Sequence, residues 1–171
     1  MMKGDDDYYA EFEALFKTLA PGLRVYLQMR MRYNRSLAED ALQEAARIMW
    51  VKWTDVRDHP NQKAWLYMVA GRLADRMMKK ASREVPEEDM SVRADAGQND
   101  SEGSSTPLQE AVGKLPERQR QAIWLHYFYG FKQHEVAAIM HIQRGAVAAL
   151  LFQARRRLAD LLGYQAGEGQ I

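Results

Sequence analysis

The stretch LPERQRQAIWLHYFYGFKQHEVAAIMHIQRGAVAALLFQARRRL, residues 115–158, decides the fold of the C-terminal part of the chain. After a helix over Leu108 to Leu115, Pro116 suits the first position of a second helix, which Gly130 would end. A short helix, Gln133 to Met140, a tight turn at His141-Ile142 and a longer helix, Arg144 to Leu162, would complete the module. Two helices joined by such a turn form a helix-turn-helix, whose second helix can enter the major groove of DNA.

The last of these helices has two unlike faces. Its buried stripe is expected, from the spacing of apolar residues, at Val147, Leu151, Ala154 and Leu158. At 100° per residue the opposite face carries Gly145, Ala149, Phe152 and Arg156, with Ala148 and Gln153 on its flanks. This face offers few side chains for bidentate base contacts, although Ala and Phe can touch thymine methyl groups.

The N-terminal part also has a helical pattern throughout. Apolar residues from Phe12 recur at helical spacing until Ala20-Pro21-Gly22, where we expect a break before a second helix. Ser36 and Glu39 have the spacing of a capping box, which predicts a helix that ends near Trp53. Residues 55–61 are expected to form a loop, followed by a fourth helix with Trp65, Leu66, Val69, Ala70 and Leu73 facing inward.

Charge is divided along the chain, although the 171 residues sum to +1. The net charge is −4 over residues 1–13, +7 over 14–81, −5 over 82–107, +4 over 108–162 and −1 over 163–171. Two basic segments indicate two modules that each bind a polyanion, although solvated helices are also often basic. The segment between them is rich in Gly, Ser, Asp, Glu and Pro, and is therefore expected to be a flexible linker.

Several classes of protein are excluded. The chain has no cysteine, which rules out disulfides, thiolate zinc sites and cysteine nucleophiles and favours a reducing cytoplasm. No apolar run is long enough to span a bilayer, and the acidic start does not resemble a secretory signal. His126, His134 and His141 lack the spacing of a known zinc site, and no catalytic pair is recognisable. We therefore expect no metal, no cofactor and no enzymatic activity.

Three stretches together resemble the extracytoplasmic-function (ECF) class of bacterial RNA polymerase sigma factors. AEDALQEAARIMWVKW (38–53) is similar to the helix by which that class binds core polymerase, and KAWLYMVAGRLADR (63–76) is similar to its promoter −10 helix. Residues 115–158 resemble its −35 domain, and the resemblance covers nearly all of residues 10–162. It implies an all-α protein with sigma region 2 at 1–81, an acidic linker at 82–107, sigma region 4 at 108–163 and a tail at 164–171.

The resemblance implies roles for the residues that match. Asp40, Gln43 and Glu44 stand where the family contacts the clamp of the polymerase β′ subunit, and their spacing places them on one helix face. In the N-terminal module, promoter DNA is expected to contact Lys63, Trp65, Tyr67, Arg72, Arg76, Lys79 and Lys80. Trp65 is at least as well suited to core packing. In the C-terminal module, the corresponding residues are Gln143, Arg144, Ala148, Ala149, Gln153, Arg155 and Arg156. The 55–61 loop stands where the family captures a flipped base.

Departures from the family pattern concentrate at promoter-reading positions. Arg72 and Arg76 replace a usual Asn or Asp, and Gln62 replaces an aromatic residue. Lys132 replaces a Ser cap, and His141 replaces the turn glycine, although histidine tolerates a left-handed backbone better than most residues. Family members often have Thr, Lys, Ser and Arg at the positions of Ala146, Ala148, Ala149 and Leu150.

The implied partners are core RNA polymerase, through its β′ clamp and β flap, promoter DNA and an anti-sigma factor, with no insertion into membrane. One alternative is a sigma-like regulator whose helix-turn-helix binds a protein, such as an anti-sigma factor or an activator, because the exposed Ala-Ala-Phe surface suits a protein partner. Another is a helix-turn-helix transcription factor that does not bind polymerase. The acidic stripe around Asp40 argues against the second alternative.

Overall fold

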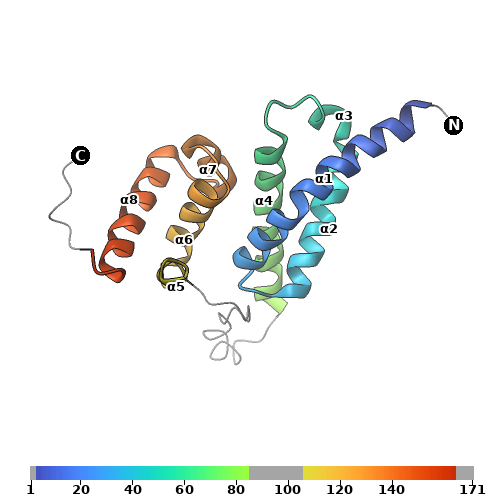
Figure 1. The fold of residues 1–171 in the computed structure, drawn as a ribbon. Coiled ribbons are helices and arrows are strands. Elements are labelled where there is room, and N and C mark those ends of the chain that lie inside the picture. The colour runs from blue at the N-terminus through green and yellow to red at the C-terminus, as the bar shows by residue number, and fades with distance from the viewer. Residues whose placement is uncertain (1–2, 85–105, 165–171) are drawn as a thin grey trace. The chain divides into compact units, whose positions relative to one another are not determined.

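The structure, a computed structural model, describes residues 3–84 and 106–164, with side chains from residue 6 onward in the first range. Every regular element within these ranges is a helix (Figure 1), which agrees with the predicted all-α class. The chain divides into two compact units, Met1–Gln98 and Asn99–Ile171. Most of the predicted linker and the tail from residue 165 lie outside the described residues.

The first unit consists of α1 (Lys3–Arg30), α2 (Arg35–Val51), α3 (Trp53–Val56) and α4 (Gln62–Glu84). The three long helices α1, α2 and α4 pack against one another in pairs. Their shared core is made of the buried side chains Leu23, Tyr26, Leu27, Met31, Ala41, Ala45, Met49, Leu66, Tyr67, Ala70 and Leu73. Small residues on α2, among them Ala38, Ala41 and Ala45, allow the neighbouring helices to approach closely.

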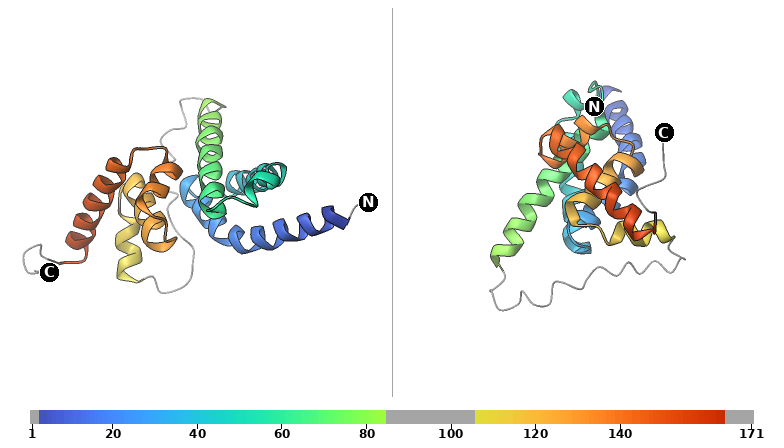
Figure 2. Two further views of the ribbon diagram at one scale, coloured as in Figure 1. Left: turned by 90° about the horizontal axis from the view of Figure 1, so that it is seen from above. Right: turned by 90° about the vertical axis from the view of Figure 1, so that its left-hand side faces the viewer.

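The predicted break at Ala20-Pro21-Gly22 is wrong, because α1 continues through Pro21. The helix bends along its length instead (Figure 2, left). Pro21, which cannot donate the helical hydrogen bond to the carbonyl group one turn earlier, is exposed. Both halves of α1 pack against the rest of the unit, Phe12 on Trp53 and Leu23 in the core, and this packing outweighs the cost of the proline.

The predicted start of α2 is also corrected. The helix is capped by Asn34, whose Oδ1 accepts a hydrogen bond from the backbone N–H of Leu37 at 3.1 Å, and Ser36 lies inside the first turn. Arg32 and Tyr33 have left-handed backbone conformations, with φ of 53° and 60°, and the helix is therefore capped two residues earlier than predicted. Part of the predicted 55–61 loop is helical, because α3 extends to Val56.

The second unit consists of α5 (Pro107–Gly113), α6 (Glu117–Ile123), a single π-helical turn η2 (Trp124–Phe128), α7 (Gln133–Met140) and α8 (Arg144–Leu161). Both α6 and α7 pack against α8 (Figures 1 and 2). Gly130 ends the α6–η2 stretch with a φ of 74°, as predicted. Pro116 occupies the cap of α6 rather than its first helical position.

The turn between α7 and α8 has the geometry of a helix-turn-helix, as predicted. His141 adopts the left-handed conformation with φ 54° and ψ 44°, and the axes of α7 and α8 differ by 103°. Val147, Leu151 and Ala154 are buried as predicted, and Leu158 is half-buried. Within the described ranges no single helix is long and apolar enough to cross a membrane; α7 and α8 meet the length and composition criteria only as this bent pair.

Candidate functional site

The first candidate surface is the exposed face of α2. Asp40 and Gln43 are exposed and Glu44 is half-buried, on the side of the helix opposite the buried alanines. Arg47 lies on the same face, and its Nε and Nη2 donate to the two Glu44 carboxylate oxygens at 2.8 and 2.7 Å. The face therefore presents acidic and amide groups with one arginine among them.

Glu44 is held in its ionised form. The hydrogen bond from Arg47 lowers the pKa of this carboxyl group, and the positive charges of Arg47 and of Arg76 on α4 act in the same direction. Glu44 is therefore a hydrogen-bond acceptor at neutral pH.

The second candidate surface is the basic side of α4. Arg72, Arg76, Lys79 and Lys80 are exposed, whereas Lys63 and Trp65 are half-buried. Tyr67 is only 1% exposed, and its ring packs 5.3 Å from that of Tyr26. In this arrangement the Tyr67 ring belongs to the core of the unit and presents no face on which an unpaired base can stack.

The short loop 57–61 between α3 and α4 is held by hydrogen bonds at its ends. The Gln62 side-chain amide donates to the Arg57 and Val56 carbonyl oxygens at 2.8 and 3.3 Å. Asn61 Oδ1 accepts from the backbone N–H of Ala64 at 2.9 Å and so caps α4. Asp58, His59 and Pro60 are exposed at the tip.

The third candidate surface is the outer side of α8. Of its predicted DNA contacts, Gln143, Arg144, Ala148 and Ala149 are all exposed. Gln153 and Arg155, although exposed, contact the unit's own residues: Gln153 Oε1 accepts from Gln119 Nε2 at 3.3 Å, and Arg155 Nη1 donates to the Tyr127 hydroxyl at 2.9 Å.

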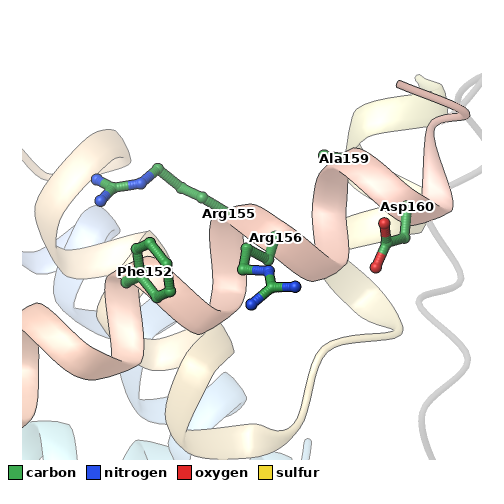
Figure 3. Close-up of a pocket in the computed structure, with 5 residues that line it drawn as sticks. All are labelled: Phe152, Arg155, Arg156, Ala159 and Asp160. Carbon is green, nitrogen blue, oxygen red and sulfur yellow. The ribbon is translucent and has the colours of Figure 1, made fainter. Parts of the chain in front are cut away.

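Phe152 and Arg156 point to the same side of α8, and Arg155 points in another direction (Figure 3). The Arg156 guanidinium lies 6.0 Å from the centroid of the Phe152 ring, which is 55% exposed. These side chains, with Ala159 and Asp160, line a shallow hollow on the surface of the helix. Its outer side therefore combines small residues, one aromatic ring and flanking arginines.

Sequence reasoning overlooked four residues that shape these surfaces. Arg47 was assigned no role, although its spacing of three from Glu44 on a helix signals an ion pair. Gln62 was noted only as a departure from the family pattern. The contact between Arg57 and Glu11 joins residues 46 positions apart, and no local sequence pattern predicts it. Among the described residues, no group of three or more histidine and acidic side chains is arranged to hold a metal ion.

The chain is similar to known proteins over both units. The family model of sigma-70 region 4 matches residues 105–158. The ECF RNA polymerase sigma factor SigM of Bacillus subtilis is 29% identical over 139 residues, which are 78% of this chain and 84% of the relative. A factor of the same description from Mycobacterium tuberculosis is 29% identical over 160 residues, 92% of this chain and 80% of the relative.

A solved structure supports the same assignment. The sigma factor RpoE of Bartonella quintana, crystallised with the anti-sigma factor NepR, matches with a TM-score of 0.68 and 26% identity, over 90% of this chain and 97% of that chain. The helix-turn-helix geometry of α7 and α8 lies inside the region 4 match. The comparisons support the resemblance: residues 105–158 match sigma-70 region 4, and the chain is similar over most of its length to RNA polymerase sigma factors of the ECF class.

Proposed function

We propose that this sigma factor binds core RNA polymerase through the exposed face of α2 and directs it to promoters with α4 and α8. The observation that carries the proposal is the acidic face of α2 within a basic helical unit. Asp40, Gln43 and ionised Glu44 accept hydrogen bonds, and arginines on the β′ clamp are the complementary donors. The β flap is the proposed contact of the second unit.

The basic side of α4 is proposed to contact the −10 element. Its arginines and lysines would neutralise phosphates. Because Arg72 and Arg76 replace a usual Asn or Asp of the family pattern, these two residues would contribute charge rather than base recognition. Tyr67 is left out of this surface because it is buried. The exposed tip of the loop 57–61 is proposed to receive the unpaired base, whose binding offsets the stacking energy lost on opening the duplex.

The outer side of α8 is proposed to contact the −35 element. Arg144 and Arg156 are twelve positions apart, about 18 Å along a helix, which is enough to place them against phosphates on both sides of a major groove. Between them lie Ala148, Ala149 and Phe152, which can contact thymine methyl groups. Gln153 and Arg155 already contact the unit's own residues, so this face favours an A·T-rich element.

An anti-sigma factor is the proposed regulator, since the similar Bartonella sigma factor was crystallised with one. Sigma factors are regulators of transcription rather than enzymes, and we propose that this chain has no catalysis of its own and acts in the cytoplasm, beside polymerase and DNA. The exposed Phe152 ring suits a protein partner as well as DNA.

The polymerase interface is tested by charge reversal. The double variant Asp40→Lys, Glu44→Lys is expected to lose measurable binding to bacterial core enzyme at low salt while its helicity, followed by circular dichroism, is unchanged. The control Asp6→Lys, Asp7→Lys makes the same change in net charge on exposed residues of α1 and is expected to bind like the unmodified chain. Equal binding by both variants would remove the assigned interface.

A further inference from the structure

The loop 57–61 is connected to the first half of α1, residues 6–16, which we call the N-terminal arm. Arg57 Nη2 donates to the two carboxylate oxygens of Glu11 at 2.8 and 3.1 Å, across 46 positions of sequence. The same guanidinium lies 4.4 Å from the centroid of the Tyr8 ring, within the range of a cation–π contact. Two arm residues therefore hold one loop residue from two directions.

The N-terminal arm is itself fixed to the unit by aromatic packing. The Phe12 ring lies 5.6 Å from that of Trp53 on α3 and 5.2 Å from that of Trp50 on α2, and the Tyr9 ring lies 5.5 Å from Trp50. Figure 1 shows this part of α1 beside α2 and α3. Glu11 thus projects from an anchored segment, and its pairing with Arg57 fixes the loop relative to the helices.

The hydrogen bonds inside the loop order its turn. His59 N–H donates to the Val56 carbonyl at 3.0 Å, and Asn61 N–H donates to His59 Nδ1 at 3.0 Å. Arg57 links this turn to α1, and its side chain is 31% exposed against 50% for Glu11. An ion pair this exposed adds little to global stability, so its main effect is on where the loop lies.

We propose that Glu11, with Tyr8, is a positioning residue for promoter opening: it holds Arg57 and so presets the loop 57–61 to receive the unpaired base. This inference rests on the function proposed above for the loop. A preset loop loses less conformational freedom when it binds, which lowers the cost of capture. The N-terminal arm would then assist strand opening without touching DNA.

The local part of the proposal is tested by amide hydrogen exchange on the full chain. Glu11→Gln removes the charge with little change of shape, and exchange at Arg57, His59 and Asn61 is expected to rise by up to about fivefold. The matched control is Glu13→Gln, two positions along α1, whose ion pair with Lys17 at 3.0 Å stays within α1. Identical exchange in the two variants would overturn the proposal.

A charge swap distinguishes the ion pair from a general effect of substitution. Glu11→Arg and Arg57→Glu are each expected to speed exchange in the loop, and the double variant is expected to restore most of the protection because the opposite charges are again paired. Additive acceleration in the double variant would contradict a direct pair.

The functional part is tested by measuring promoter opening. A promoter is first identified by mapping the transcripts that the holoenzyme makes from genomic fragments, and its −10 element is then labelled with 2-aminopurine in the non-template strand. Holoenzyme with Glu11→Gln is expected to open a smaller fraction of duplex, by up to about fivefold, with unchanged core affinity. Equal opening, or greater opening because Arg57 is freed for phosphate, would overturn the proposal. If the unmodified chain neither binds core nor starts transcription, the proposed function fails first and the inference fails with it.

Discussion

α4 and α8, the two helices proposed to meet promoter DNA, differ in what they expose. Four of the cationic side chains of α4 that were expected to contact DNA are exposed, whereas Tyr67, an aromatic residue expected to stack on bases, lies on the buried side of the helix. α8 exposes small residues and Phe152 between two arginines, while Gln153 and Arg155 contact the unit's own residues. We propose that the first surface binds DNA by charge and the second by shape and apolar contact.

This difference suits the two helices to different contributions to promoter binding. Charge on α4 is expected to give affinity for any phosphate backbone, and this effect weakens as salt rises. The proposed apolar contacts of α8 with base edges would add little affinity but would discriminate between sequences. Specificity is therefore expected to come from α8 and from the loop 57–61, and affinity from α4.

The largest expected effect comes from destabilising the core of one unit while the core of the other stays intact. Leu151 on α8 and Leu66 on α4 are both fully buried. Leu151→Ala is expected to destabilise the second unit by about 2–5 kcal/mol, and Leu66→Ala to do the same to the first. Hydrogen exchange resolved by residue would show each loss confined to its own unit; loss of protection in both units from either variant would contradict two separate cores.

The next expected effect distinguishes phosphate binding by charge from base recognition on the basic side of α4. Lys79→Ala with Lys80→Ala is expected to weaken binding to every DNA sequence by about tenfold near 0.1 M salt and to reduce the salt slope by as much as about 2. Titrations of holoenzyme on fluorescent promoter and non-promoter duplexes at several salt concentrations provide the measurement. A loss restricted to promoter sequence would assign base recognition to these lysines.

On α8 the opposite pattern is expected. Phe152→Ala removes an exposed ring and no charge, so it is expected to cost about 1 kcal/mol on duplexes with thymine in the −35 element and nothing on non-specific DNA. Arg156→Ala, four positions along the same side, is the comparison variant and is expected to lower the salt slope by about 1 instead. Interchanged results would mean that the two side chains have the opposite roles.

The helices of the second unit follow closely from local signals. Gly130, the turn at His141 and the buried stripe of α8 lie where spacing predicts, because each depends on neighbouring residues. The first unit is predicted less well where tertiary packing decides. Pro21 does not break α1, and Asn34 caps α2 although Ser36 is an equally good cap by type.

The distinction between local signals and tertiary packing also explains which surface residues could be predicted from the sequence. Asp40, Gln43 and Glu44 share a face because helical periodicity alone requires it, whereas the burial of Tyr67 depends on its meeting Tyr26 of α1. The contact of Arg57 with Glu11 and Tyr8 depends on how α1 packs against α2 and α3. Such contacts between distant segments produce no periodic pattern in the sequence, so they cannot be predicted from it.

The smallest expected effect concerns the turn that orients α8. His141 has a left-handed backbone, which glycine adopts without strain. His141→Gly is expected to change the free energy of unfolding of the second unit by no more than about 0.5 kcal/mol, since relief of strain is partly offset by greater freedom of the unfolded chain. Denaturant titration followed by near-UV circular dichroism would detect a larger loss, which would show that the imidazole itself supports the turn.

The most direct measurement of the central claim is reconstituted transcription, with the purified chain and bacterial core enzyme on a library of genomic fragments whose RNA 5′ ends are mapped. The account predicts discrete start sites that require the chain, preceded at −35 by a shared A·T-rich element whose thymines become unimportant with Phe152→Ala. The account would be contradicted if core enzyme bound the chain but produced no start sites that require it.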